Sequence, residues 1–127
     1  MPVMAVRVTV ERRVTVERQS CCAFYHRAVE LIGKRWTGAI LSVLLDGPLH
    51  FSEIRGLVPD ISDRLLSERL KELESEGIVE RRVIEGSPVR TEYSLTEKGE
   101  ALEPAVRALQ QWARGWLTES APGRVRR

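Results

Sequence analysis

The clearest pattern in this chain of 127 residues is Ile61-Ser-Asp-Arg-Leu-Leu-Ser-Glu-Arg-Leu-Lys-Glu-Leu-Glu-Ser-Glu-Gly77. Its apolar residues recur every three or four positions, which is the spacing of a helix with one buried face. They are Leu65, Leu66, Leu70 and Leu73. Ser62 suits the N-cap, because its hydroxyl can accept a hydrogen bond from a backbone N–H of the first turn, and Gly77 suits the C-terminal end. The stretch therefore predicts a capped helix that buries its leucines.

A short helix and a hairpin flank this segment. On the N-terminal side, residues 52–58 have the apolar spacing of a helix, for which Ser52 is a candidate N-cap, and a turn follows. On the C-terminal side the period switches to two, which predicts strands at residues 78–84 and 89–95. Glu85-Gly-Ser-Pro88 lies between them and predicts a hairpin tip.

Further elements are expected on either side. Helical spacing predicts helices at residues 24–33, 35–45 and 96–117, and a short strand is expected at 49–51. Pro104 falls inside the last helix and could kink it. The resulting order, in which a short helix, a turn, a longer helix and a hairpin follow one another, is typical of a winged helix-turn-helix. In such a domain the second helix of the pair lies in the major groove of DNA.

The two ends of the chain differ from its body. Residues 1–20 contain a direct duplication, Val8-Thr-Val-Glu-Arg12 and Val14-Thr-Val-Glu-Arg18. The alternation is typical of a strand, but a single residue separates the copies and no hairpin turn is present, so they are expected to pair poorly. We therefore predict a mobile tail at 1–20, with an added edge strand or arm as the alternative. The domain itself is predicted at 21–117, followed by a basic, disordered tail at 118–127.

The charge of the chain does not by itself require a nucleic acid. The net charge is +2, but the first twenty residues carry +2 and the last four carry +3, so residues 21–123 carry −3. A DNA-binding face must then be a local basic patch on an acidic body. The alternative is a winged-helix module that binds protein without sequence-specific DNA binding. Salt distinguishes the two, because phosphate contacts make affinity fall steeply with ionic strength.

Several classes of protein are not expected. No apolar run approaches the roughly 20 residues of a membrane helix, and residues 1–10 lack the continuous apolar segment of a signal peptide, so a cytoplasmic protein with no membrane partner is expected. The adjacent Cys21 and Cys22 cannot form a disulfide framework. The only histidines, His26 and His50, are not in a metal-ligand spacing with them. We expect no enzyme, metal or cofactor, and no small-molecule effector is assigned.

Four stretches of the chain resemble the HxlR-type family of bacterial winged-helix regulators. They are Val29-Glu-Leu-Ile-Gly-Lys-Arg-Trp36, Leu44-Leu-Asp-Gly-Pro-Leu-His-Phe-Ser-Glu-Ile54, Ile61 to Gly77 as quoted above, and Tyr93-Ser-Leu-Thr-Glu-Lys-Gly99. The resemblance covers about residues 21–117 and implies a dimeric transcription factor whose first and last helices form the dimer interface. The fold class it implies is mainly α with a small β-hairpin (α+β), a winged helix-turn-helix with N- and C-terminal dimerisation helices.

The residues that would face DNA follow from the helical geometry of 61–77. At about 100° per residue, the leucines cover one arc and a polar set covers the opposite one. The N-terminal part of a recognition helix reads the major groove, and the fork of Arg64 matches O6 and N7 of guanine. Serines suit phosphate or base contacts, and Lys71 suits a phosphate. The predicted DNA contacts are Ser62, Arg64, Ser67, Glu68 and Lys71, with Gly86, Ser87 and Arg90 at or beside the hairpin tip.

Some of these residues also have a structural interpretation. Ser62 can serve as an N-cap alone, and Glu68 repels phosphate, so that it is either a helix-start charge or a specificity filter. Arg69 falls within the leucine arc, which predicts a structural, salt-bridging arginine. Arg81 and Arg82 point to opposite faces of their strand, so at most one of them faces DNA.

The dimer interface and a redox sensor complete the predicted sites. The interface is expected to include Phe24, Leu31, Leu109, Trp112 and Trp116. Family members use a cysteine before the first helix to sense oxidants or electrophiles, so the resemblance makes Cys21 or Cys22 the candidate sensor, although the family usually has proline after the first cysteine. Nearby cationic residues and the start of the helix favour a thiolate there. The alternative is that both cysteines only pack as small apolar residues.

Overall fold

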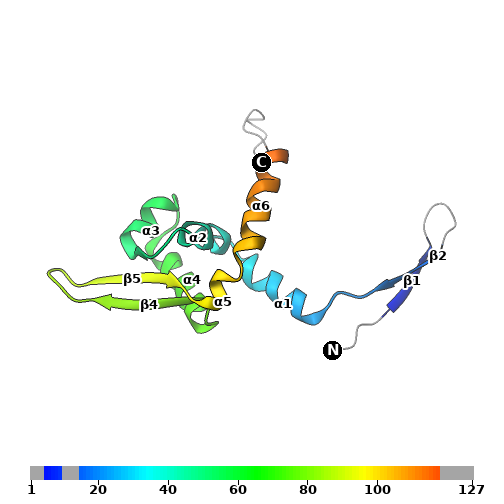
Figure 1. Cartoon of the computed structure of the whole chain (residues 1–127), viewed down its shortest axis with the longest axis horizontal. Coiled ribbons are helices and arrows are strands. Elements are labelled where there is room, and N and C mark those ends of the chain that lie inside the picture. Colours follow the sequence, from blue (N-terminus) through cyan, green and yellow to red (C-terminus); the bar gives the residue numbers. More distant parts are fainter. Residues whose placement is uncertain (1–4, 10–14, 118–127) are drawn as a thin grey trace. The chain divides into compact units, whose positions relative to one another are not determined.

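The structure is a computed structural model that describes residues 5–9 and 15–117, with side chains from residue 19 onward. It divides into two units, residues 1–34 and 35–127. Figure 1 shows the elements of both. None of the described helices is long and apolar enough to cross a membrane.

The first unit contains a hairpin that the sequence analysis did not expect. Strand β1 (Ala5–Thr9) pairs with β2 (Thr15–Gln19) in antiparallel fashion, with Val8 opposite Val16. The prediction that the duplicated copies do not pair is therefore wrong. The strands are offset from the copies, since β1 begins before the first copy and β2 ends after the second. The mobility of residues 1–20 stays a prediction.

Helix α1 (Ala23–Ile32) follows the hairpin and has the predicted bounds within one residue. Cys22 is its N-cap and Gly33 its C-cap, and the Gly33 N–H donates to the Val29 carbonyl at 2.7 Å. No side chain of α1 is buried. The helix therefore has no core of its own in the described chain.

The second unit has the predicted order of elements. It consists of α2 (Thr37–Leu44), β3 (Leu49–His50), α3 (Phe51–Leu57), α4 (Asp63–Ser75), β4 (Val79–Ile84), β5 (Arg90–Leu95), α5 (Glu97–Glu100) and α6 (Glu103–Trp116). The sheet is antiparallel in the order β3-β5-β4, and Tyr93 of β5 lies between Leu49 of β3 and Arg81 of β4. Helix α6 projects away from the sheet (Figure 1). The mainly α fold with a small winged sheet is confirmed.

The core of this unit is made by the apolar spacings that define its helices. Helix α4 buries Leu66, Leu70 and Leu73, while Leu65 is only half-buried. The other fully buried apolar side chains are Ile40, Leu41 and Leu44 of α2, Ile54 of α3 and Val79 of β4. Burying this area is the main favourable term for a domain of this size. The core thus holds the α3–α4 pair against the sheet.

Two predicted helix starts are wrong in detail. Helix α2 begins at Thr37, because Trp36 lies in the left-handed region with a φ of 80°. Helix α3 begins at Phe51, and its N-cap is His50 instead of Ser52. The Glu53 carboxylate accepts the His50 backbone N–H at 2.7 Å, so the first turn is closed by an acidic side chain that Ser52 cannot replace.

The last predicted helix is two helices. Thr96 caps α5 as expected, since its hydroxyl accepts the Gly99 N–H at 3.1 Å. A break at Ala101 and Leu102 separates α5 from α6. Pro104 is the second residue of α6, where its missing N–H has no intrahelical acceptor in any case, so it starts the helix and does not kink it.

Candidate nucleic-acid interface

Helices α3 and α4 form the helix-turn-helix and are tied together across their turn. Val58 and Ile61 are buried beneath it, and Asp60 adopts a positive φ of 73°. The Arg55 guanidinium of α3 donates to both carboxylate oxygens of Asp63 at the start of α4, at 3.2 and 3.0 Å. A single guanidinium nitrogen, Nη1, makes both of these charge-assisted hydrogen bonds. Sequence reasoning missed this pair, whose members lie eight residues apart.

The free face of α4 presents the polar side chains that were predicted to read DNA. The Ser62 hydroxyl accepts the Leu65 N–H at 3.1 Å, so its role as N-cap is confirmed, while its DNA contact stays a prediction. The Arg64 side chain is 88% exposed, and its Nε lies 3.4 Å from a Glu68 carboxylate oxygen. Such an exposed pair is weak and can exchange for another acceptor.

Arg69 has the structural position that its place on the helical wheel predicts. Its side chain is only 16% exposed. The guanidinium donates to the Arg35 carbonyl at 3.0 Å and lies 3.5 Å from Glu72. Arg69 therefore ties α4 to the segment before α2 and is not free to contact a base.

The hairpin β4–β5 has the geometry of a wing. Gly86, Ser87 and Arg90 are exposed at its tip, and together with His50 they help to line a shallow cavity of about 250 Å³. Arg82 lies opposite Glu92 on β5 and donates to it at 2.8 Å; this hydrogen bond raises the pKa of Arg82. Arg81 points to the other face, toward α4.

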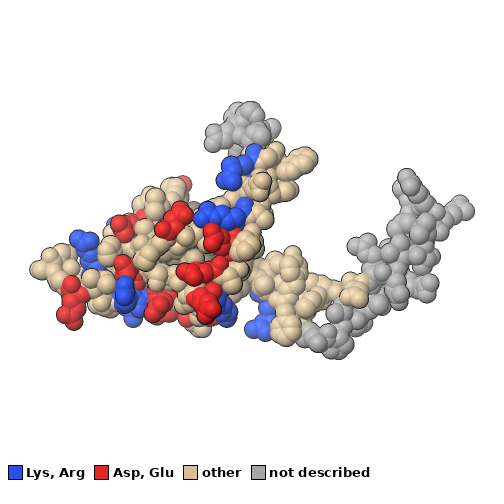
Figure 2. Space-filling model, in the orientation of Figure 1, with Lys and Arg blue, Asp and Glu red and all other residues tan. Residues whose placement is uncertain are grey.

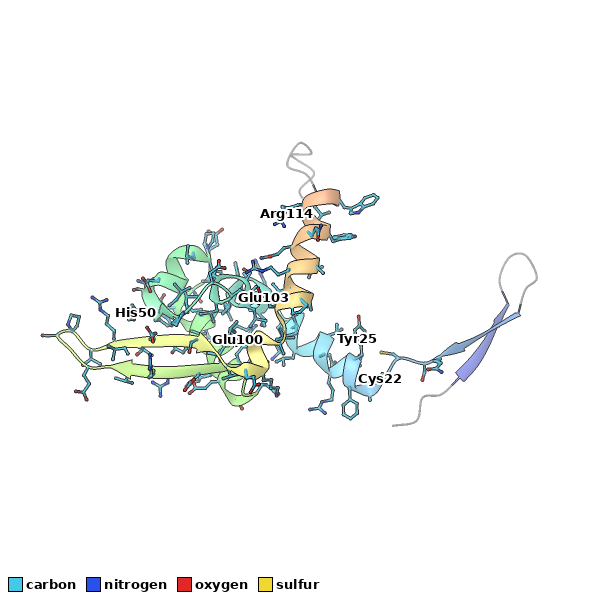
Figure 3. All side chains as sticks on the ribbon, viewed as in Figure 1. Cys22, Tyr25, His50, Glu100, Glu103 and Arg114 are labelled. Carbon is cyan, nitrogen blue, oxygen red and sulfur yellow. The ribbon has the colours of Figure 1, made fainter. Side chains whose placement is uncertain are left out.

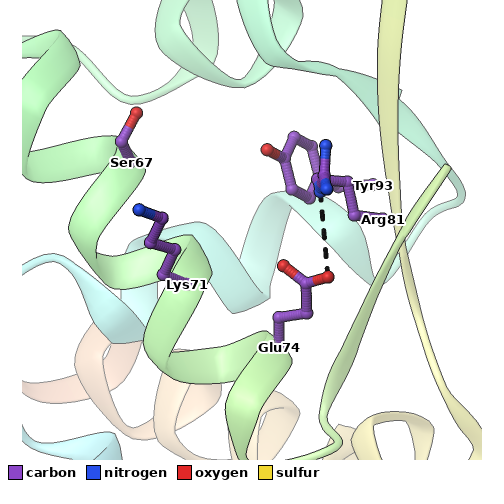
Figure 4. A pocket seen from close by; sticks show the side chains of 5 residues that line it. All are labelled: Ser67, Lys71, Glu74, Arg81 and Tyr93. Atoms are coloured by element: carbon purple, nitrogen blue, oxygen red, sulfur yellow. Dashed lines mark ion pairs between the residues drawn. The ribbon is translucent and has the colours of Figure 1, made fainter. Parts of the chain in front are cut away.

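A pocket of about 270 Å³ lies between α4 and the sheet (Figure 4). It is lined by Ser67, Lys71 and Glu74 from α4, Arg81 from β4 and Tyr93 from β5. The Arg81 guanidinium lies 3.8 Å from the Glu74 carboxylate. Burial raises the pKa of Tyr93. Sequence reasoning did not identify this pocket, although the alternation of the strand already placed Arg81 and Arg82 on opposite faces.

Acidic and basic side chains interleave on the face of the molecule shown in Figure 2. Much of the acidity is paired with arginine, as in Arg55–Asp63 and Arg82–Glu92. The surface in view therefore has no extended region of one charge, in keeping with the expectation that any DNA-binding face is local.

Cys22, labelled in Figure 3, is the N-cap of α1, and Cys21 is the residue before it. Cys21 is exposed and Cys22 is half-buried; both are free thiols. The Cys21 thiol donates weakly to the Cys22 carbonyl at 3.5 Å. One turn into the helix, the His26 ring lies 3.4 Å from Glu30. Among the described residues no cluster of three or more His, Cys, Asp or Glu side chains is placed to hold a metal ion.

Both helices that were predicted to form a dimer interface expose large apolar side chains. On α1, Phe24 and Tyr25 are exposed, whereas Leu31 is half-buried. On α6, which buries no residue, Trp116 is 75% exposed. The other large exposed apolar residues at this end of the described chain are Leu109, Trp112 and Leu117. Arg107 anchors the base of α6, with Glu103 at 3.2 Å and Asp46 at 3.3 Å.

A short helix, a turn, a longer helix with an exposed polar face and a hairpin follow one another in this chain. Comparison with known protein families gives the same assignment. The profile of the HxlR-like helix-turn-helix family matches residues 31–121. This chain belongs to the HxlR-like helix-turn-helix family. It is 47% identical over 105 residues to the HTH-type transcriptional regulator YvaP of Bacillus subtilis (strain 168). The aligned residues make up 83% of this chain and 97% of YvaP. It is 50% identical over 92 residues to the HTH-type transcriptional regulator YodB of the same organism, and the alignment covers 72% of this chain and 82% of YodB.

Solved structures of relatives support the same assignment. The reduced form of YodB aligns with a TM-score of 0.68 at 47% identity, over 77% of this chain and 96% of that one. The redox regulator HypR in its reduced form aligns with a TM-score of 0.70 at 38% identity, over 73% of this chain and 92% of the HypR chain. These relatives are transcriptional regulators. The HxlR-type protein described here is accordingly a transcriptional regulator and not an enzyme, as predicted.

Proposed function

We propose that this HxlR-type regulator binds double-stranded DNA as a homodimer at a pseudo-palindromic operator, and that oxidation at Cys21 or Cys22 changes its affinity. The observation that carries the DNA proposal is the free polar face of α4, which stands beside the exposed wing of β4 and β5. A recognition helix and a wing are the two elements that such a domain presents to the grooves of DNA.

Within α4, Arg64 is the residue proposed to read a base. It is the second residue of the helix, and its side chain is almost fully exposed. Its ion pair with Glu68 is exposed and therefore weak, so a base can replace Glu68 as the partner. A guanidinium that binds O6 and N7 of guanine discriminates against other bases by about 1–3 kcal/mol. Ser67, Glu68 and Lys71 flank it, and Arg90 beside Gly86 and Ser87 would contact the backbone or the minor groove.

The test measures binding to DNA from upstream of the chain's own gene, compared with random-sequence DNA. Arg64→Ala should weaken binding to the specific site by about 1–3 kcal/mol and relax the preference at one position in each half-site. Arg90→Ala should weaken binding to both DNAs and lower the salt slope by about one for each subunit. Arg114→Ala, an exposed arginine on α6, is the control and should change neither.

The outcome also decides against the alternative of a protein-binding module. A wild-type protein whose affinity for both DNAs is equal and low, with no salt dependence, contradicts the proposal. If the operator preference of Arg64→Ala equals that of wild type, Arg64 is not the base reader, and the rest of the proposal stands.

Dimerisation is supported by the exposed apolar side chains of α1 and α6. Indole and phenyl rings bury large areas and dominate the energetics of interfaces. Neither helix has a buried side chain, so each exposes a surface that a second copy would cover. A two-fold dimer would place two copies of α4 about one turn of DNA apart, which is the reason for expecting a palindromic operator.

Redox control is supported by the exposure of Cys21 and by the forms in which relatives have been studied. YodB has been solved after diamide treatment and with quinone bound, and HypR in an oxidised form. In this chain, adjacent cysteines make a strained pair. We therefore propose a disulfide between subunits, in which two thiols lose two electrons and two protons to an oxidant such as diamide, or addition of one thiolate to a quinone.

A further inference from the structure

The pocket between α4 and the sheet contains polar groups that have no partner in the described chain. The Ser67 hydroxyl, the Lys71 ammonium and the Tyr93 hydroxyl make no hydrogen bond or ion pair within residues 19–117. Tyr93 is only 9% exposed as a whole residue, so its ring is packed in place, and its hydroxyl is held at the pocket. Figure 4 shows its hydroxyl pointing toward the side of the pocket formed by Ser67 and Lys71.

The local structure explains why these side chains converge. Ser67, Lys71 and Glu74 are spaced by three and four residues, so they share one face of α4. Arg81 and Tyr93 lie directly opposite each other in the β4–β5 register, so they share one face of the sheet. That face is turned to α4, as the approach of Arg81 to Glu74 shows.

The chemistry of the pocket favours an anion rich in acceptor oxygens. A lysine ammonium and an arginine guanidinium only donate hydrogen bonds, and the hydroxyls of Ser67 and Tyr93 can donate. Because burial raises the pKa of Tyr93, its phenol stays protonated at neutral pH. Two cations face the single carboxylate of Glu74. At 3.8 Å, with no hydrogen bond, the Arg81–Glu74 pair is loose enough to be replaced.

We propose that this pocket seats a backbone phosphate of DNA, and that Glu74 holds Arg81 in position until the phosphate replaces it. The proposal rests on the DNA-binding function proposed above and adds Arg81, Tyr93 and Glu74 to it. The pocket lies between α4 and the strands β4 and β5, which are the two elements proposed above to contact DNA. Arginine, lysine, serine and tyrosine are common donors to phosphate oxygens.

The substitutions have distinct signatures. Lys71→Met and Arg81→Met each remove one of the two cations that face the phosphate, so each should lower the slope of log affinity against log salt, and the two together should lower it by about 0.9 for each subunit on DNA. Tyr93→Phe removes a hydrogen bond and no charge, so it should weaken binding several-fold with an unchanged slope. Glu74→Gln removes a repulsion and should tighten binding by about threefold, the effect of two like charges about 6 Å apart in water.

The experiment measures binding of the full chain to a random-sequence duplex by fluorescence anisotropy, between about 50 and 200 mM salt. Over this range each phosphate contact accounts for about a 3.5-fold loss of affinity. Arg82→Gln and Glu80→Gln are the matched controls, because these residues lie on β4 with their side chains on the face away from α4. Both should bind as wild type does. Thermal unfolding of every variant excludes loss of folding as the cause.

The result that overturns the inference is a wild-type slope in Lys71→Met and Arg81→Met together with unchanged affinity in Glu74→Gln. If the wild-type protein binds no DNA at all, the proposed function fails, and the two failures are thus distinguishable. Inorganic phosphate provides a second arm. Saturable phosphate binding that Arg81→Met abolishes, with DNA slopes unchanged, would assign the pocket to a free anion and overturn the assignment to DNA.

Discussion

Replacing Gly99 with alanine tests how tightly α5 packs on Ile78, the residue before β4, and on Leu95 of β5. A Cβ atom at Gly99 would overlap the backbone carbonyl oxygen of Ile78 and lie 3.1 Å from a methyl carbon of Leu95. The carbonyl cannot move away without loss, because it accepts the Thr96 N–H at 3.0 Å. The backbone itself is therefore the obstacle, and no side-chain rotation relieves the overlap.

The opposing effects on stability can be compared. Alanine favours a helix over glycine by about 1 kcal/mol. Overpacking a core position costs about 1–3 kcal/mol, and losing the hydrogen bond between Ile78 and Thr96 costs about 1 kcal/mol more. The net expectation for Gly99→Ala is a destabilisation of about 1–3 kcal/mol. For a unit of this size, each kcal/mol lowers Tm by about 4–8 °C.

The assay is thermal and urea unfolding at one fixed protein concentration, because association shifts apparent stability. Gly56→Ala is the matched control, since Gly56 is an exposed residue of α3 whose added Cβ meets no atom within 4 Å. It should stabilise the protein by about 0.5–1 kcal/mol, so the two substitutions differ in sign. A Gly99→Ala protein as stable as wild type, or more stable, would refute the packing of α5 on Ile78.

Three other outcomes are expected. Trp112→Glu should give monomers or insoluble protein in sedimentation at micromolar concentration. The control Leu57→Glu changes an exposed apolar residue of α3 and should leave a dimer. A dimeric Trp112→Glu protein would contradict the assignment of α6 to the interface. Diamide or quinone should change the DNA affinity of wild type but not of the Cys21→Ser, Cys22→Ser protein, and equal affinities throughout would leave both thiols as packing residues. Because burial raises the pKa of Tyr93 above its usual value near 10, the stability linked to its neutral phenol is present below about pH 10 and is lost as pH rises through the folded pKa. Absorbance titration should show this late step, and Tyr93→Phe should lack it.

The features that the sequence predicted are those encoded within about twenty consecutive residues. The leucine spacing of α4, its Ser62 cap and the alternation of β4 and β5 are local patterns, and the structure has all three. The position of Arg69 followed from the same helical wheel. In each case the period of the element already determines which side chains are buried.

The features that were missed depend on groups that meet only in the folded chain. The pairing of Arg55 with Asp63 and the approach of Arg81 to Glu74 depend on how helices and strands are placed, which no periodicity reports. The N-cap of α3 was missed for a related reason. Serine has a stronger intrinsic preference for the N-cap position than histidine. Here, however, the Glu53 carboxylate accepts the backbone N–H of His50, and this hydrogen bond places the start of the helix at Phe51. The β1–β2 hairpin was missed because the duplicated copies were taken as the pairing units.

The acidic balance of residues 21–123 is compatible with DNA binding once the ion pairs are considered. The carboxylate of Asp63, at the start of α4, is paired with Arg55, so its charge is partly compensated where DNA would lie. Lys71 lines the pocket between α4 and the sheet and has no ion-pair partner among the described residues. A surface of this kind attracts DNA less strongly than a uniformly basic one, and fewer counterions are released from the DNA when the complex forms. Discrimination between sites must then depend more on base contacts, such as the one proposed for Arg64, than on the attraction of the backbone.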